Sequence, residues 1–213
     1  METVLSSTPQ NQKTHPDSDA GREADPLALF QDLFKQALQS DMKEPRAMSV
    51  STVDADGQPD VRMLLLKGVD ANGFVFYTNL QSRKAKAIQN DPRVALCFYW
   101  PALDKQVRIR GHACPVSNEE ADAYFLTRPR LSQISAWASK QSEPMRGYFE
   151  LEAEVVKTIL RFGVGPVQRP PFWSGFRVVP YWIEFWDQKA FRRHHRVAYE
   201  RLGATWQKHW LYP

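Results

Sequence analysis

Strand-like segments joined by short turns dominate the first half of the chain and determine its fold class. Residues 47–53 and 61–69 flank "DADGQP", whose Asp-Gly pair is a hairpin signal. Residues 93–100 and 106–116 flank "PALDK" in the same way. Strands joined by such short turns pair antiparallel, because a parallel pair needs a long crossover connection. The order of the elements therefore excludes a doubly wound parallel sheet.

Helical patterns are grouped in the middle of the chain, after these strands. Residues 117–128 begin with Ser117 and carry Glu120 three positions later, which is a capping box, and Pro129 ends that helix. Two helical segments and then three strand-like runs follow, at residues 131–141, 143–162, 175–186, 192–202 and 205–213. We therefore predict an α+β fold with a β-barrel core.

The N-terminal residues differ in composition from the rest. Residues 1–24 are rich in Ser, Thr, Gln, Asp and Pro, and we expect a disordered tail there. Asp25 then caps a helix that has Pro26 in its first turn and an apolar stripe running from Leu27 to Leu38. With 43% hydrophobic residues over 213 positions, we expect residues 25–213 to form a single domain.

Several classes of protein are disfavoured by composition. No apolar run reaches the roughly 18 residues of a membrane span, and the N-terminus lacks the apolar region of a signal peptide, so we expect a cytoplasmic protein. Cys97 and Cys114 lack metal-ligand spacing, which favours buried free thiols and no metal site. The net charge of +4 does not by itself indicate DNA binding. No GxGxxG or Walker loop is present, so any nucleotide must be held in another way.

Two cations and a hydroxyl stand where a predicted strand, residues 74–79, gives way to a short predicted helix. Ser82, Arg83 and Lys84 occupy the start of that helix. Cations in a first turn oppose the helix dipole at a cost of about 0.3–1 kcal/mol each, and a bound phosphate would reverse the sign. The alternative is a solvated helix start.

Two further groups could also bind anions. Arg62 and Lys67 bracket a strongly apolar strand, and their spacing of five turns them to opposite faces of a regular strand; the alternative is an ordinary strand with charged ends. Tyr124 and Arg128 share one helix face, with Ser132 near the start of the next helix. A phenol, a guanidinium and a hydroxyl together suit a phosphate ester, although an exposed helix end would look the same.

The fourth group is "RRHHR", residues 192–196, in a strand-like run after "IEFW". Strand alternation would place Arg192, His194 and Arg196 on one face, with Arg193 and His195 on the other. The alternative is an exposed basic edge strand. Each group is weak evidence alone, but all four indicate phosphates, and more than one of them.

Taken in order, these motifs make the sequence resemble the pyridoxamine 5′-phosphate oxidase family from about Asp25 to Pro213. The motifs that carry the resemblance are "RMLLLK", "FYTNLQSRKA", "YFLTRPRLSQISAWASKQS", "RPPFWSGFRV" and "IEFW" followed by R-x-H-x-R. The resemblance implies a split β-barrel and a homodimer with FMN at the subunit interface. It implies neither a nucleic-acid partner nor a membrane.

The resemblance also assigns roles to individual residues. It implies FMN contacts for Arg62, Met63, Leu64, Leu65, Leu66, Lys67, Tyr77, Thr78, Arg83, Lys84, Gln106, Gln141, Ser142, Trp186 and Arg196. Gln141, Ser142, Trp186 and Arg196 would come from the other subunit. It implies that Lys67, Tyr124, Arg128 and Ser132 hold the substrate phosphate, while the catalytic candidates Arg192 and His194 stand over the pyridine ring.

The implied reaction oxidises pyridoxamine or pyridoxine 5′-phosphate to pyridoxal 5′-phosphate, with O₂ as acceptor and hydrogen peroxide as product. Two departures from the family pattern are visible. Residues 10–24 do not match an Arg- and Tyr-containing segment that helps to close the family's site, and "RRHHR" replaces the common "RLHDR". Alternative functions are a split-barrel flavin or haem binder without oxidase activity, an oxidase of another small metabolite, and a basic nucleic-acid-binding barrel.

Overall fold

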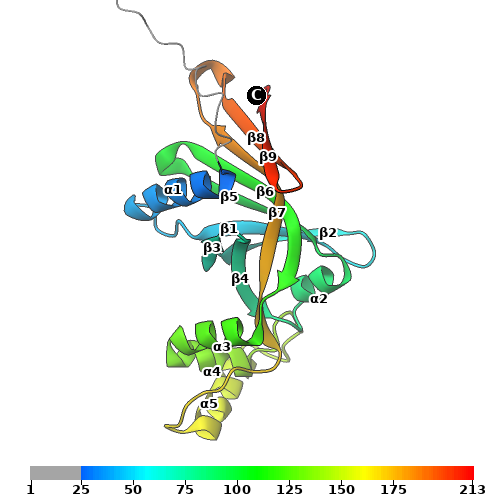
Figure 1. Cartoon of the computed structure of the whole chain (residues 1–213). Helices are drawn as coiled ribbons and strands as arrows, with labels where there is room; N and C mark the ends of the chain where they lie inside the picture. The colour runs from blue at the N-terminus through cyan, green and yellow to red at the C-terminus, as the bar shows by residue number, and fades with distance from the viewer. Residues whose placement is uncertain (1–24) are drawn as a thin grey trace, which may run out of the picture.

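The computed structural model describes residues 25–213, so the predicted tail 1–24 lies outside the described part. Within this part of the chain, nine antiparallel strands form one curled sheet in the order β2-β1-β5-β6-β7-β4-β3, with β8 paired to β7 and β9 to β8 (Figure 1). The strands are β1 Ala47–Val53, β2 Pro59–Leu65, β3 Gly68–Asp70, β4 Gly73–Asn79, β5 Arg93–Trp100, β6 Lys105–Pro115, β7 Trp173–Asp187, β8 His195–Leu202 and β9 Thr205–Leu211. The predicted α+β class and split barrel are confirmed.

Five α-helices accompany the sheet in residues 25–213: α1 Pro26–Gln39, α2 Arg83–Asn90, α3 Asn118–Thr127, α4 Arg130–Ala138 and α5 Glu150–Phe162. Short 3-10 turns cover Pro101–Leu103 and Ala190–Arg192. Helices α3, α4 and α5 gather at one end of the molecule, whereas β8 and β9 lie at the opposite end (Figure 1). No helix in the described part of the chain is long and apolar enough to cross a membrane.

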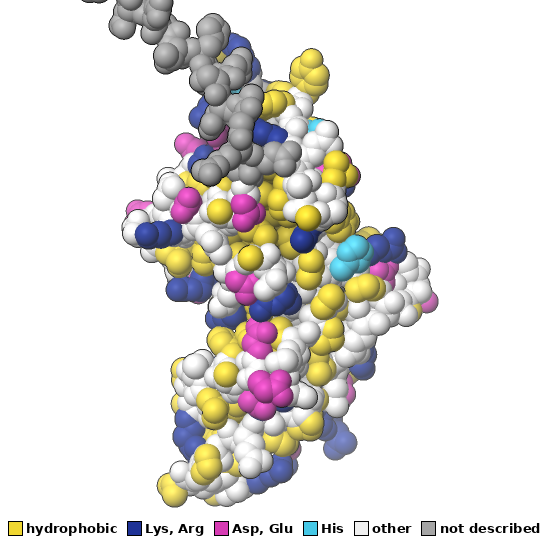
Figure 2. Space-filling model, viewed as in Figure 1, with side chains coloured by type: hydrophobic (Ala, Val, Ile, Leu, Met, Phe, Trp, Pro, Cys, Tyr) yellow, Lys and Arg dark blue, Asp and Glu magenta, His cyan; other side chains and the backbone are white. Residues whose placement is uncertain are grey.

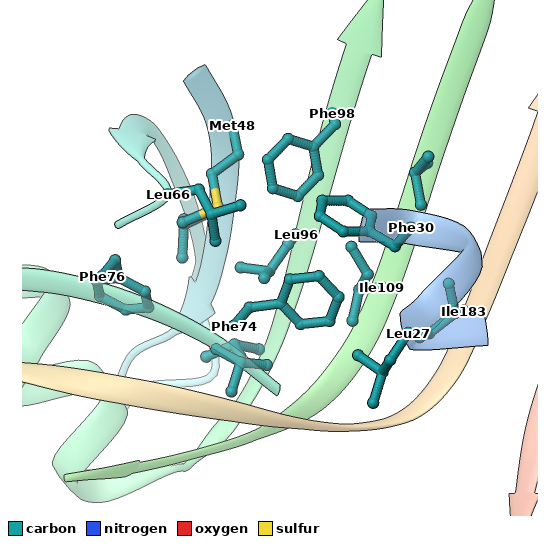
Figure 3. Close-up of a cluster of buried hydrophobic side chains, with 14 of the residues drawn as sticks. Leu27, Phe30, Met48, Leu66, Phe74, Phe76, Leu96, Phe98, Ile109 and Ile183 are labelled. Carbon is teal, nitrogen blue, oxygen red and sulfur yellow. The ribbon is translucent and has the colours of Figure 1, made fainter. Parts of the chain in front are cut away.

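The main core lies between α1 and the curled sheet. Asp25 caps α1 by accepting a hydrogen bond from the Leu27 amide at 3.0 Å, as predicted. The fully buried Phe30 ring meets Phe74 edge-on at 4.8 Å and Phe98 at 5.0 Å (Figure 3). Such edge-to-face pairs are a favoured arrangement of aromatic rings, and they fix α1 against β4 and β5.

Strand β7 links the two ends of the molecule. Its first residues pair with β4, and its last residues pair with β8, while β6 accompanies it along nearly its whole length. Trp173 and Trp186 therefore stand thirteen residues apart on one strand, which corresponds to roughly 40 Å of extended chain. Side chains near the start and the end of β7 belong to separate regions of the subunit.

Three predicted elements need correction. The expected strand 61–69 is interrupted, because β2 ends at Leu65 and pairs with β1, whereas β3 begins at Gly68 and pairs with β4. The expected helix 143–162 begins only at Glu150. The expected strand 192–202 begins at His195, since Arg192 lies in a 3-10 turn.

The two cysteines also differ from the expectation. Cys97 is half-buried and Cys114 is exposed, so the expectation of two buried thiols is wrong for Cys114.

Two arguments from strand alternation fail as a result. Arg62 and Lys67 do not share one regular strand, so their spacing says nothing about faces. Arg192 and His194 precede β8, and Arg192 has a positive φ of 59°. Alternation therefore does not group these two residues with Arg196, and it does not set Arg193 apart from Arg192.

Candidate active site

A cavity of about 490 Å³ opens where the turn between α3 and α4 faces strand β4. Its lining residues are Leu64, Lys67, Tyr77, Thr78, Asn79, Tyr124, Thr127, Arg128, Pro129, Ser132, Ser135, Ala136, Ser139, Gln141 and Trp173. Lys67 and Arg128 are its charged residues, and no Asp or Glu lines it within the described chain. A cavity with cationic and hydroxyl groups but no carboxylate is suited to an anion.

The turn between α3 and α4 forms the cationic wall of this cavity. Arg128 ends α3 in an extended conformation, with φ −74° and ψ 145°, because Pro129 disfavours helical geometry in the residue before it. The side-chain amide of Gln133, in α4, donates to the carbonyl of Phe125, in α3, at 3.0 Å. This bond fixes the two helices against each other and brings Ser132 into the wall that contains Tyr124 and Arg128.

Arg128 has no counter-ion among the residues that the structure describes. Its Nη1 atom is buried and has no hydrogen-bond partner among residues 25–213, while its guanidinium lies 4.6 Å from the centroid of the Trp173 ring. Burial lowers the pKa of Arg128 from its ordinary value. An unpartnered buried donor is costly, so this arrangement favours a ligand that brings an acceptor.

Three aromatic rings stack beside Arg128. Tyr77 and Tyr124 lie 4.0 Å apart at 12°, and Tyr77 and Trp173 lie 5.3 Å apart at 4°. Gly175 makes this packing feasible, because a Cβ atom there would approach the Tyr77 ring to 2.7 Å. Burial, with the nearby Glu120 carboxylate, raises the pKa of Tyr77 to about 12. The Tyr77 hydroxyl therefore remains protonated and can donate a hydrogen bond.

A second cationic centre adjoins the cavity at the start of α2. Ser82 caps α2 and is fully buried, and Lys84 is only 8% exposed. The Lys84 ammonium donates to Gln141 Oε1 at 2.8 Å and to Thr78 Oγ1 at 3.3 Å. Burial lowers the pKa of Lys84, and the neighbouring charge of Arg62 lowers it further. The alternative of a solvated helix start is therefore wrong for Ser82 and Lys84.

Thr78 and Gln141 connect the two centres, because both line the cavity and both contact Lys84. The amide of Arg83 donates to Ser142 Oγ at 3.3 Å. Gln141 and Ser142 thus lie beside α2 of their own chain, and their predicted contribution to the other subunit stays a prediction. The side chain of Arg83 is exposed.

Residues 62–67 divide between several environments. Arg62 donates to Val50 O and to Thr52 Oγ1, both at 2.9 Å, and pairs with Asp60. Leu64 and Lys67 line the cavity, Leu66 lies in the core, and Met63 and Leu65 are exposed on the outer face of β2. Only part of this predicted FMN-binding stretch therefore reaches the cavity within one chain.

The remaining predicted residues form a separate cluster near the end of β7. Gln106 and Arg196 are the cross-strand partners of Trp186, on either side of it. The His194 ring lies 4.6 Å from the Trp186 ring, and the Lys189 amide donates to His194 Nδ1 at 3.2 Å. The structure does not bring this cluster to the cavity of the same chain, because β8 lies at the end opposite to α3 and α4 (Figure 1).

Trp173 is one of the cavity residues to which the sequence assigned no role. It belongs to the "RPPFW" segment that marks the resemblance, but an aromatic residue after a Pro-rich loop is typical of a core position. Its contact with Arg128 joins residues far apart in the sequence. No local spacing of residues could have predicted this contact.

Among residues 25–213, no group of three or more His, Cys, Asp or Glu is placed to hold a metal ion.

The fold of this chain also occurs in solved structures of other proteins. The chain matches PhzG from Burkholderia lata, solved in complex with tetrahydrophenazine-1-carboxylic acid, with a TM-score of 0.85 and 28% identity over 95% of this chain and 98% of that one. A pyridoxamine 5′-phosphate oxidase-related, FMN-binding protein from Nostoc punctiforme has the same fold, with a TM-score of 0.70 and 18% identity over 86% and 97% of the two chains. The chain therefore has the split-barrel fold of these proteins, with a cavity beside β4.

Family comparisons make this assignment more specific. Residues 34–160 match the pyridoxamine 5′-phosphate oxidase family, and residues 173–213 match the pyridoxine 5′-phosphate oxidase C-terminal dimerisation region. The chain therefore belongs to the pyridoxamine 5′-phosphate oxidase family and is an oxidoreductase. It is 51% identical to the pyridoxine/pyridoxamine 5′-phosphate oxidase of Azorhizobium caulinodans over 96% of this chain and 97% of that one. It is 52% identical to that of Maricaulis maris over 89% and 86%.

Proposed function

We propose that this protein is an FMN-dependent oxidase that converts pyridoxamine or pyridoxine 5′-phosphate to pyridoxal 5′-phosphate, with O₂ as acceptor. The observation that carries the proposal is the cavity, which has two cations and, within the described chain, no carboxylate, and which lies next to a further, buried cation on α2. A flavin mononucleotide and a phosphorylated substrate bring two phosphates, and the chain offers two separate places for them.

The donors on α2 fit the FMN phosphate. Lys84 is buried beside neutral oxygens of Thr78, Ser82 and Gln141, and no carboxylate pairs with it among the described residues. A helix N-terminus favours anions in the same place. Bound FMN would supply the hydride acceptor and the reaction with O₂ that gives hydrogen peroxide.

The donors on the turn between α3 and α4 fit the substrate phosphate. Arg128 offers an unpartnered Nη1 atom, and Lys67, Tyr124 and Ser132 line the same cavity. Holding the substrate by its phosphate uses binding energy from a remote group to orient the reacting carbon. In this proposal no side chain acts as a nucleophile, and the residues of the chain bind, orient and exclude water.

A second copy of the chain completes the site in this proposal. Cross-strand pairing places Met63, Ser49, Cys97, Arg108 and Glu184 in one row on the sheet face that points away from the core. The β2 end of this row is apolar and exposed, with Val61 60% and Met63 63% exposed. Exposed apolar patches of this kind mark interaction sites. Figure 2 shows hydrophobic side chains at the surface on one face of the molecule.

A two-fold axis across this face would bring the β7–β8 end of one chain to the β2 and α2 region of its partner. Trp186 and Arg196 of the partner would then contact the flavin, and the partner's Arg192 and His194 would contact the substrate ring. The match of residues 173–213 to a dimerisation region supports this assembly.

Peroxide formation from pyridoxamine 5′-phosphate by the purified, FMN-loaded protein tests the proposal. We expect a yellow dimer that turns over this substrate and prefers it to unphosphorylated pyridoxamine. A colourless protein that takes up no FMN would refute the cofactor assignment. An FMN-loaded dimer that is inactive on both phosphorylated substrates would favour oxidation of another small metabolite, and the carboxylate ligand bound by PhzG makes that alternative concrete.

A further inference from the structure

We propose that Trp173 is a positioning residue that presents the Arg128 guanidinium to the phosphate group of the substrate. The inference rests on the proposed function, because it concerns the same phosphate. It assigns to Trp173 the selectivity for phosphorylated over unphosphorylated substrates. The indole face holds the cation in place of a carboxylate, so the N–H groups of Arg128 stay available to the ligand.

Other arginines of the candidate site are held in a different way. Arg196 donates to both carboxylate oxygens of Glu184 at 3.0 Å and to the carbonyl of Tyr212 at 2.8 Å. Arg62 donates to Val50 O, Thr52 Oγ1 and Asp60. These hydrogen bonds fix each guanidinium but use its donors.

Arg128 shows the opposite arrangement. Its Nη1 has no partner within residues 25–213, and its guanidinium lies 4.6 Å from the Trp173 ring and 5.5 Å from the Phe125 ring. The N–H donors of arginine lie in the guanidinium plane. A contact over a ring face uses none of these N–H donors, so it leaves them available for a bidentate contact with phosphate oxygens.

Trp173 is itself held rigidly. Arg169 donates to the Trp173 carbonyl at 2.8 Å and to Asn118 Oδ1, on α3, at 3.0 Å. The Trp173 ring also meets Phe125 edge-on at 5.1 Å and lies parallel to Tyr77. The backbone of Trp173 is thus tied to the helix that ends in Arg128, so ring and guanidinium keep their relative position without a direct polar bond.

Trp137 provides a matched control. Arg161 lies 4.7 Å from its ring in the same way, and both tryptophans belong to or pack against the same small hydrophobic cluster. Trp137 does not line the cavity. A substitution at Trp137 therefore removes an Arg–Trp contact and some packing without touching the proposed phosphate site.

The experiment compares FMN-loaded wild type, Trp173→Leu, Trp173→Phe and Trp137→Leu. Measurements are KM and kcat for pyridoxamine 5′-phosphate, FMN content, and binding of inorganic phosphate by phosphorus NMR. We expect Trp173→Leu to raise KM by about tenfold and to weaken phosphate binding, with FMN content and kcat near wild type. Trp173→Phe, which keeps an aromatic face, should restore most of the KM. Trp137→Leu should leave KM unchanged.

Three results would overturn the inference: an unchanged KM and phosphate affinity in Trp173→Leu, an equal rise in KM in Trp137→Leu, or a Trp173→Phe variant as impaired as Trp173→Leu. Failure of the proposed function is distinguishable, because a wild type without turnover would still show phosphate binding that depends on Trp173. If the wild type turns over and prefers the phosphorylated substrate, an unchanged preference in Trp173→Leu would count against Trp173 alone.

Discussion

Replacing Lys84 by methionine removes the buried ammonium at the start of α2 and keeps a side chain of similar length. The three acceptors around Lys84 Nζ are neutral oxygens, at 2.8 Å for Gln141 and 3.3 Å for Thr78 and Ser82. Among residues 25–213 no carboxylate forms an ion pair with this ammonium, and in the proposed function it binds the FMN phosphate. Losing one charge-assisted hydrogen bond costs about 1.5–3 kcal/mol, which raises Kd by about ten- to a hundredfold.

The lowered pKa of Lys84 determines the direction in which the stability of the folded protein changes with pH. The pKa of Lys84 in the folded apo-protein lies below its ordinary value of 10.5, because burial disfavours the ammonium form. Between the folded and unfolded pKa values, the unfolded chain binds more protons than the folded one. The stability of the apo-protein should therefore rise as pH increases through that window. Lys84→Met should lack this rise, while FMN binding by wild type should weaken over the same range.

Titration of the apo-proteins with FMN, followed by flavin fluorescence, measures the affinity, and denaturant unfolding at several pH values measures the stability. Lys86→Met is the control, because Lys86 lies on the same helix but is exposed. A wild-type Kd in Lys84→Met, or an equal loss in Lys86→Met, would refute the assignment of Lys84 to the flavin phosphate.

Two further changes test the packing around the site. Gly175→Ala would place a Cβ atom 2.7 Å from the Tyr77 ring and 2.8 Å from the Phe76 carbonyl, so we expect a loss of about 1–3 kcal/mol and a higher KM. Gly147→Ala, where nothing lies within 4 Å of the added atom, should be neutral in the same thermal and kinetic assays. Glu184→Gln leaves Arg196 and Arg108 without their buried carboxylate; we expect a loss of about 3 kcal/mol and a Tm lower by roughly 6–12 °C, whereas an unchanged Tm would show that the network contributes little.

Local signals in the sequence predicted the helix starts and the hairpins well. Asp25 and Ser117 each cap the helix that they were expected to cap, because a capping hydrogen bond spans only two or three residues. Ser82, which was placed at the start of the short helix, also caps it. The grouping of Lys67, Tyr124, Arg128 and Ser132 was expected from the family resemblance, and all four line one cavity.

The errors in the predicted elements arose where contacts between residues far apart in the sequence determine the backbone conformation. The strand around Leu66 and Lys67 breaks because the chain changes partner there: the Leu66 amide bonds to Arg46 O, and the Lys67 amide bonds to Val75 O. The apolar pattern continues through this corner, so periodicity cannot reveal it. The late start of α5 had a local signal, since Pro144 and Gly147 precede Glu150.

The segment before β8 shows a further limit of reasoning from periodicity. Phe191 and Arg192 both adopt positive φ, at 57° and 59°, which costs about 1–2 kcal/mol per residue outside glycine. "RRHHR" contains no apolar alternation that would separate a turn from a strand. The turn and the contact of His194 with Trp186 therefore had to come from the structure.

Subunit complementation tests whether one site draws on two chains. Arg128 lines the cavity, whereas Arg192 lies near the far end of β7, roughly 40 Å of strand away from Trp173. We expect Arg128→Ala and Arg192→Ala to be poorly active as separate dimers. If Arg192 serves the partner's cavity, a hybrid dimer contains one doubly altered site and one unaltered site.

Random mixing of the two variants makes about half of the dimers hybrid, so about a quarter of wild-type activity should return. The measurement is peroxide formation by co-refolded protein, with differently tagged chains to isolate the hybrids. Both residues are altered outside the main core, since Arg192 is exposed and Arg128 lines the cavity, so the hybrid should assemble normally. Hybrids that remain as inactive as the parent dimers would mean that Arg128 and Arg192 of one chain serve the same site, and the two-chain site would be wrong.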